Sequence, residues 1–441
     1  MLPIRPSPRK LHAAARCPAA MGARRAGAGM SADIAKDVAP PPAAPGALGR
    51  GGRLSGELLW LLAGLAALGA LATNIILPAF PAMGADLGVS VKELSATLSS
   101  FFLAFALGQL AVGPLSDRFG RSRLVLGGLL VFVAGSALCA LATTLPQLIC
   151  GRVVQALGVC ATSVLSRAIA RDLFDGAALA RALSLTMVAM AAAPGFSPLL
   201  GGAFSRWLGW RATFVLVAVL AVVLAIHYAT RLGETHAADR RSPLSLAATA
   251  GTYGQLLRDR RFIAPALAVA LVIGALYAFF AMAPAILMAG FGFSPLALGL
   301  LFAATVFVVF GAGFMAPRLA RLWGPLRAAR AGIALALAAG IAVWLGPHEL
   351  HFFCAALTAF LLGMGLVNPL ATAIALQPFG RQAGAASALL GFLQMGCAAL
   401  AVSVGAALER SAYDALGLIL STSLALSLCV FVLLAPRAPP P

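Results

Sequence analysis

Long apolar stretches, separated by short polar connections, make up most of this chain. From Leu59 to Leu434 they recur at the length of about 20 residues that one helical crossing of a membrane needs. Each run is continuous rather than alternating, so the pattern predicts helices and not the strands of a β-barrel. The twelve predicted crossings are residues 57–79, 94–115, 123–143, 146–168, 181–202, 210–231, 262–287, 296–317, 328–346, 351–374, 384–407 and 413–434.

The longest internal hydrophilic stretch divides these crossings into two sets of six. The predicted segments are an N-terminal tail at 1–53, a six-helix bundle at 54–231, a cytoplasmic linker loop at 232–261, a second six-helix bundle at 262–435 and a C-terminal tail at 436–441. The first tail is rich in Ala, Pro, Gly and Arg, which predicts a disordered segment. The alternatives are an organellar transit peptide, which the charge of the tail would allow, and a start codon read too early, with Met21 or Met30 as the true start.

Composition and charge narrow the class of protein. The chain is 61% hydrophobic and only 10% charged, which indicates a polytopic membrane protein. A net charge of +18 would suit a nucleic-acid-binding protein, but nearly all the Arg residues fall in the first tail or in short loops. Loops on one side carry most of them, so we expect that side, and both termini, to be cytoplasmic in the cell inner membrane.

No cluster of side chains in the sequence indicates catalysis or metal binding. The seven Cys residues show no metal-ligand spacing, and His348-Glu349-Leu350-His351 lacks the spacing that places two His on one helical face. We therefore expect no enzyme, no cofactor and no metal. The expected partners are a small-molecule substrate, the lipid bilayer and, if transport is coupled, protons; the chain is expected to be a monomer.

One polar connection is short, charged and punctuated by glycine. It runs from Gly113 to Arg123 and reads GPLSDRFGRSR. Its ionisable side chains cannot lie in lipid, so it is predicted to be a turn at the membrane surface between the second and third crossings. A similar segment, Ala316–Arg321, follows the eighth crossing, with Ala320 in the place of the acid, which favours an internal duplication.

This turn resembles the signature G-x-x-x-D-R-x-G-R of the major facilitator superfamily. The resemblance implies an all-α membrane protein with the major facilitator fold, in which two pseudo-symmetric six-helix bundles alternate between access states. In that family the acid and the arginines pair across neighbouring helix ends and bias one state; a turn that only sets topology is the alternative. The implied switch residues are Gly113, Asp117, Arg118, Gly120 and Arg121.

Other segments resemble the drug-resistance exporters of the Bcr/CflA type. These segments are Leu77–Pro81, Arg152–Gly158, Ala193–Gly202, Trp210–Phe214, Asn368–Pro369 and Ala383–Gly391. The resemblance implies a secondary transporter that exports small amphipathic drugs or metabolites by proton-coupled antiport. In such exporters the position four residues before the first-helix proline is commonly an Asp, but here it is Asn74, which does not titrate. An uncoupled or anion-preferring facilitator is therefore the alternative, and a non-transporting sensor or scaffold is a third interpretation.

Arg152 is the charge that the pattern places inside a crossing. An ionisable group at depth usually faces a wet cavity, although a long side chain near a helix end can instead reach the interface. Gln155 lies on the same helical face, and buried amides need partners, which adds further candidates. The predicted substrate-binding or coupling residues are Asn74, Gln109, Arg152, Gln155, Tyr277, Asn368 and Gln394.

The fifth predicted helix combines prolines with glycines. Proline removes a backbone hydrogen bond and kinks a helix, while glycine lets two helices approach closely. This combination suits a gate between the two bundles, with plain packing as the alternative. The predicted gating residues are Pro194, Pro198, Gly201 and Gly202.

Overall fold

The computed structural model describes residues 56–236 and 246–434. Both predicted tails, and the linker arginines Arg240 and Arg241, lie outside the described residues. The chain divides into two units, Met1–Pro45 and Gly46–Pro441, and everything below concerns the second unit.

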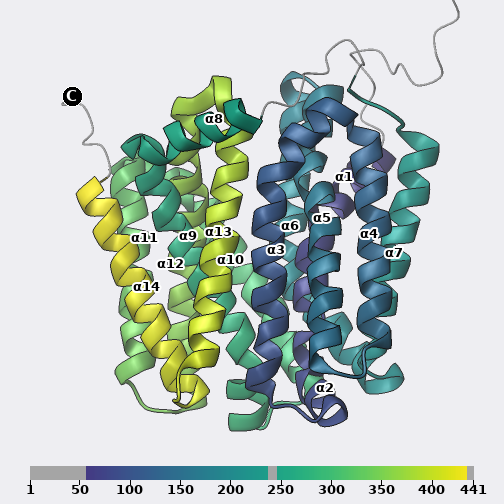
Figure 1. Cartoon of the computed structure of the whole chain (residues 1–441). Helices are drawn as coiled ribbons and strands as arrows, with labels where there is room; N and C mark the ends of the chain where they lie inside the picture. Colours follow the sequence, from purple (N-terminus) through teal and green to yellow (C-terminus); the bar gives the residue numbers. More distant parts are fainter. Residues whose placement is uncertain (1–55, 237–245, 435–441) are drawn as a thin grey trace, which may run out of the picture. The chain divides into compact units, whose positions relative to one another are not determined.

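Helices form all the regular structure of the described residues (Figure 1). They are α1 (Gly56–Asn74), η1 (Leu77–Ala79), α2 (Phe80–Leu87), α3 (Val91–Phe119), α4 (Arg121–Leu141), α5 (Leu145–Leu173), α6 (Gly176–Leu208), α7 (Arg211–Arg231), α8 (Leu246–Arg258), α9 (Arg260–Ala283), η3 (Pro284–Gly290), α10 (Pro295–Trp323), α11 (Pro325–Leu345), α12 (Leu350–Leu376), η4 (Gln377–Gln382), α13 (Ala383–Ala407) and α14 (Ala412–Leu434).

Twelve helical stretches in this part of the chain are long and apolar enough to cross a membrane, which confirms the predicted fold class. Several helix ends differ from the sequence prediction by a few residues: α3 continues to Phe119 and α4 begins at Arg121, so most of the predicted turn 113–123 is helical. Three other differences bear on the site. The first stretch continues beyond residue 79 through η1 and α2 to Leu87, because Pro78 in the 3-10 turn interrupts the helix without ending it. Helix α5 extends to Leu173 instead of residue 168, and helix α8 occupies much of the predicted linker loop.

Successive crossings alternate in direction, so the loops gather at two ends. We call the end at which α3 gives way to α4 the Asp117 end, and the opposite end, where α2 finishes, the Asp86 end. Helix α8 lies at the Asp117 end (Figure 1, top), and α2 lies at the Asp86 end (bottom). Helices α1 to α7 form the first half and α9 to α14 the second, with α8 packed against α9 and α13 of the second half.

The helix contacts of the second half repeat those of the first. Helix α4 packs on α5 and α7 as α11 packs on α12 and α14, and α1 packs on α6 as α9 packs on α13. The two halves meet mainly through α3 against α13 and α6 against α10, which is itself a symmetric pair of contacts. This repetition shows two pseudo-symmetric six-helix bundles within the described unit.

The two equivalent turns at the Asp117 end also share their backbone geometry. Gly120, between α3 and α4, has φ of 92°, and Gly324, between α10 and α11, has φ of 82°. A side chain would strain the backbone in this region of φ, so glycine is needed where each long helix reverses into the next.

Candidate functional site

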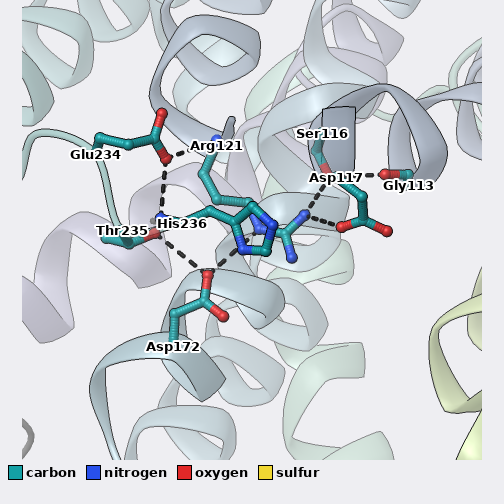
Figure 2. A network of polar contacts seen from close by, with 8 residues as sticks. All are labelled: Gly113, Ser116, Asp117, Arg121, Asp172, Glu234, Thr235 and His236. Atoms are coloured by element: carbon teal, nitrogen blue, oxygen red, sulfur yellow. Dashed lines mark hydrogen bonds and ion pairs between the residues drawn. The ribbon is translucent and has the colours of Figure 1, made fainter. Parts of the chain in front are cut away.

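A network of charged side chains lies at the Asp117 end (Figure 2). Arg121, at the start of α4, forms an ion pair of 2.7 Å with Asp117 of α3 and one of 3.3 Å with Asp172 at the end of α5. It also donates to the Ser116 hydroxyl, which in turn donates to the Gly113 carbonyl at 2.8 Å. The Arg121 side chain is only 11% exposed, so these charge-assisted contacts are partly screened from water and join the ends of α3, α4 and α5.

The segment that follows α7 completes the network. The Glu234 carboxylate accepts from the backbone N–H of Arg121 at 2.9 Å, although the two residues lie 113 positions apart. Thr235 donates its hydroxyl to Asp172 at 3.3 Å, and the backbone N–H of His236 donates to Glu234 at 3.0 Å (Figure 2). Gly120 cannot cap α4 with a side chain, so Glu234 supplies the negative group that a helix N-terminus favours.

The predicted switch residues are therefore brought together, with one exception. Arg118 makes no ion pair with either aspartate, and its guanidinium carbon lies 5.1 Å from the centre of the Phe119 ring. No carboxylate of the described residues lies within ion-pair distance of Arg118. The turn sequence did not indicate that Asp172 and Glu234, from other parts of the chain, would be the remaining partners of Arg121.

A cavity of about 470 Å³ lies next to this network. Its walls come from α3, α4 and α5 of the first half and from α8 and α13 on the side of the second half. Asp117, Arg121 and Asp172 line it, as does Arg167, a residue that the sequence analysis did not single out. Tyr253 of α8 also lines it and donates its hydroxyl to the Leu110 carbonyl of α3 at 3.1 Å.

Arg152 lies in a second polar cluster, inside the first half and toward the Asp86 end. Its guanidinium donates to the Ala72 carbonyl of α1 at 3.1 Å and to the side-chain oxygen of Gln155, and stacks 4.2 Å from the centre of the Phe101 ring. Gln155 then donates to the Ser136 hydroxyl of α4 at 2.8 Å. The cluster thus joins four helices of the first half.

The Arg152 side chain is fully buried, so it does not reach the interface at the helix end. Its Nε and one terminal nitrogen have no hydrogen-bond partner among the described residues, and no carboxylate there lies within ion-pair distance. A buried, unpaired cation is costly, so Arg152 is a position at which a negative or strongly dipolar group would be favoured.

The other predicted substrate residues are spread over the interior. Asn74 is buried and donates to the Ala70 carbonyl at 2.8 Å. Gln109 of α3 packs against Gly391 of α13, where the two halves meet. Tyr277 of α9 also lies at this contact, and the centre of its ring is 4.5 Å from that of Phe102 of α3.

Asn368 and Gln394 are partly buried on α12 and α13. Of the seven predicted substrate residues, only Arg152 and Gln155 are joined to each other by a hydrogen bond in the described part of the chain. None of the seven lines the cavity at the Asp117 end.

The predicted gating residues lie in the half of α6 nearer the Asp86 end. Pro194 and Pro198 are within the helix, and Gly201 lies directly against the Ile75 carbonyl between α1 and η1. At Gly202 the Pro295 carbonyl of α10 would be only 2.7 Å from a Cβ atom, so the two halves touch here at backbone distance.

The Asp86 end carries its own ion pair. Arg211, at the start of α7, lies 2.5 Å from Asp86 of α2 and donates to the Ala142 carbonyl at 3.0 Å. The Trp210 indole donates to the same carboxylate at 3.1 Å. The Trp210–Phe214 segment therefore joins α7 to α2 and to the end of α4. The sequence did not indicate that Asp86 would be the partner of this segment.

Comparisons with known proteins agree with this architecture. A sequence profile of the Major Facilitator Superfamily matches residues 62–402. The chain is 32% identical to the uncharacterized MFS-type transporter YdgK of Bacillus subtilis, over 77% of this chain and 85% of that protein. It is 28% identical to multidrug resistance protein D of Escherichia coli (83% and 92% covered) and 31% identical to a chloramphenicol resistance protein of Pseudomonas aeruginosa (72% and 74%).

Solved structures with the same fold include the nucleoside transporter NupG and a D-xylose–proton symporter. Each superposes with a TM-score of 0.66, at 13% and 15% sequence identity respectively. The match covers 85% of this chain and 98% of NupG, and 86% of this chain and 98% of the symporter.

Proposed function

The chain belongs to the major facilitator superfamily, and from this premise we propose that it exports small amphipathic drugs or metabolites by alternating access, through proton-coupled antiport. As a member of that family it is a multi-pass membrane transporter of small molecules, and the prediction that it is not an enzyme is confirmed. The resemblance to drug-resistance exporters is also confirmed by its relatives, whose names support export as the direction of transport.

The observation that carries the proposal is the difference between the two ends. At the Asp117 end a cavity lies between first-half helices and α8 and α13, and Tyr253 of α8 bridges it to the Leu110 carbonyl of α3. At the Asp86 end the halves are in contact, at Gly202 and through Lys92, which donates to the Leu408 carbonyl at 2.6 Å. The space between the halves is larger at the Asp117 end, about 470 Å³, than at the Asp86 end, about 180 Å³, and a rocking motion of the two bundles would exchange this difference.

The charged network at the Asp117 end supports a switching role. Asp117, Arg121 and Asp172 hold three helix ends of the first half together while all of them face the cavity. Closing that cavity would bring second-half atoms against these charges and change their solvation, so the network is placed to bias one state over the other.

We propose that the substrate binds among the seven predicted side chains, of which Gln109 and Tyr277 lie where the halves meet. Arg152 and Gln155 supply donors from the first half, and Tyr277, Asn368 and Gln394 come from the second. A fixed cation at depth favours negative or strongly dipolar groups, and the neighbouring rings of Phe101 and Phe102 provide apolar surface.

Coupling to protons needs a carboxylate that water reaches. Asn74 does not titrate, but Asp117 and Asp172 line the cavity and are 50% and 23% exposed, so either is placed to exchange a proton with it. The second candidate, an uncoupled or anion-preferring facilitator, is favoured by Asn74 and by the unpaired cation of Arg152. The arginine bias of the loops supports the cytoplasmic membrane, with both termini cytoplasmic, and we expect a monomer.

Substrate flux from proteoliposomes, with and without an imposed pH gradient, tests this proposal. Antiport predicts that a gradient directed against the substrate accelerates flux and that flux in turn moves protons. Transport that ignores the gradient would overturn antiport and leave the facilitator. If Asn74→Asp then created dependence on the gradient, the missing proton carrier of the first helix would be identified.

A further inference from the structure

Arg167 of α5 is a second cation inside the protein. Helix α5 runs to Leu173, so Arg167 lies six residues before its end, a depth of about 9 Å at 1.5 Å per residue. It is only partly exposed, and the surface that it exposes lines the cavity at the Asp117 end.

The surroundings of Arg167 leave its charge uncompensated. Within the described part of the chain its one polar contact is with the sulfur of Met190 on α6, at 4.0 Å, and a thioether is a weak acceptor. No carboxylate of the described residues lies within ion-pair distance. The two aspartates of the cavity wall, Asp117 and Asp172, are bound to Arg121 instead.

A second arginine adds to the positive charge of this wall. Arg171 also lines the cavity, one helical turn from Arg167, and like charges at this spacing repel each other. Of the residues that the structure describes, three arginines and two aspartates face the cavity, which leaves one positive charge in excess among them. An anion in the cavity would therefore relieve an unfavourable arrangement as well as make new contacts.

The cavity also has the size and the walls for an organic molecule. Its volume of about 470 Å³ falls in the usual range of small-molecule sites, about 300–1,000 Å³. Pro114, Leu165 and Tyr253 supply apolar surface beside the arginines. The wall from α13 consists of small residues, including Ala385 and Ser387, which leave room for an aromatic body.

We propose that this cavity is a binding site for small organic anions, with the carboxylate or sulfonate on Arg167 and the apolar body between α3, α8 and α13. The site is separate from the Arg152 cluster, which lies toward the other end of α5. The inference concerns a second site, since none of the seven proposed substrate residues lines this cavity, and it rests on the proposed function only for the claim that the bound anion is cargo.

Binding of matched probes to the purified full chain in nanodiscs tests the inference. Isothermal titration calorimetry would compare 2-naphthoate with 2-naphthamide, which has the same shape without the charge, and benzoate with benzamide. The acids are expected to bind at least about tenfold more tightly than the amides, since charge-assisted hydrogen bonds are about twice as strong as neutral ones. Equal binding of acid and amide, or no binding of either acid, would overturn the inference.

Variants locate the charge that makes the difference. Arg167→Gln is expected to reduce acid binding to the level of the amide, while Arg167→Lys keeps most of the preference. Arg181→Gln is the matched control, since Arg181 is an exposed arginine of α6 outside the cavity wall. A correctly folded Arg167→Gln protein that keeps the preference would overturn the assignment.

A second variant covers the case in which Arg167→Gln does not fold. Ala385→Glu places a carboxylate on the opposite wall and is expected to abolish acid binding at unchanged thermal stability; unchanged binding would again overturn the site. Proteoliposomes separate the two proposals. Acid that binds through Arg167 but is not transported contradicts the proposed function alone, whereas transport of another amphipathic compound without charge-selective binding contradicts the inference alone.

Discussion

Replacing Gly202 by Ala perturbs the contact between the halves at the Asp86 end. The added Cβ atom would lie 2.7 Å from the Pro295 oxygen and 3.1 Å from its carbonyl carbon. Both neighbours are backbone atoms of α10 and cannot rotate away, so α6 and α10 must separate. Gly311 of α10 is the matched control, because a Cβ atom there would have nothing within 4 Å.

The size of the effect follows from this overlap. Overpacking a tight contact by one methyl group costs about 1–3 kcal/mol. The strain exists only while the Asp86 end is closed, so it shifts the equilibrium between access states by about 5- to 150-fold toward the state with that end open. If the two ends open alternately, the cavity at the Asp117 end becomes less accessible by a similar factor.

Thiol labelling measures this shift. Ser387→Cys places a thiol in the cavity at the Asp117 end, and its rate of reaction with a charged, membrane-impermeant reagent reports how open the cavity is. The parent chain without Ser387→Cys gives the background from its native cysteines. We expect slower labelling with Gly202→Ala and an unchanged rate with Gly311→Ala.

Two results would refute the reasoning. Unchanged labelling in a protein of lower thermal stability means that the strain is absorbed locally and the ends are not coupled. Faster labelling means that separation at the Asp86 end opens the other end as well, which contradicts alternating access.

Three further predictions concern single polar contacts. Glu234→Gln removes the negative charge at the backbone N–H of Arg121, so the free energy of unfolding should fall by about 0.3–1 kcal/mol. Thermal unfolding should show that this loss becomes smaller in high salt. Equal losses in low and high salt would contradict a charge effect. Arg152→Met replaces an unpaired buried cation by an apolar chain, and we expect stabilisation by about 1–4 kcal/mol with loss of transport; retained transport would remove Arg152 from the site. Burial raises the pKa of the Tyr253 phenol, so the hydroxyl stays protonated and donates to Leu110 across the neutral pH range. Tyr253→Phe should therefore change the rate of cavity labelling by the same factor at every neutral pH. A change confined to the upper end of that range would contradict this prediction.

The sequence was a good guide to the features that depend on local pattern. The thickness of the bilayer fixes the length of a spanning helix, so the twelve helices could be predicted from the continuous apolar runs. The long hydrophilic stretch between the sixth and seventh runs predicted the two halves. The turn at Gly120 could be predicted too, because charged residues between two apolar runs must lie at the membrane surface and glycine allows the chain to reverse there. Helix α8 was missed, since a surface helix in a polar linker lacks the apolar length that marks a crossing.

Partners from distant parts of the chain could not be predicted. Arg121 meets Glu234 and Arg211 meets Asp86 only because the fold brings together segments that lie 113 and 125 positions apart in the chain. Arg167 was overlooked for a different reason: a boundary placed five residues short turned a residue inside α5 into one at its end. Small errors in helix length thus have large effects on which charges are judged to be buried.

The hydrogen bond from the start of α4 to Glu234 shows that the first half includes the segment that follows α7. The described groups of the charged network lie between Gly113 and His236, while α8, from Leu246, packs on the second half. A polypeptide break placed between residues 236 and 246 would leave the network intact within one fragment. The transporter should therefore be reconstitutable from two separately synthesised pieces cut at that position, whereas a cut before Glu234 would separate α4 from its cap.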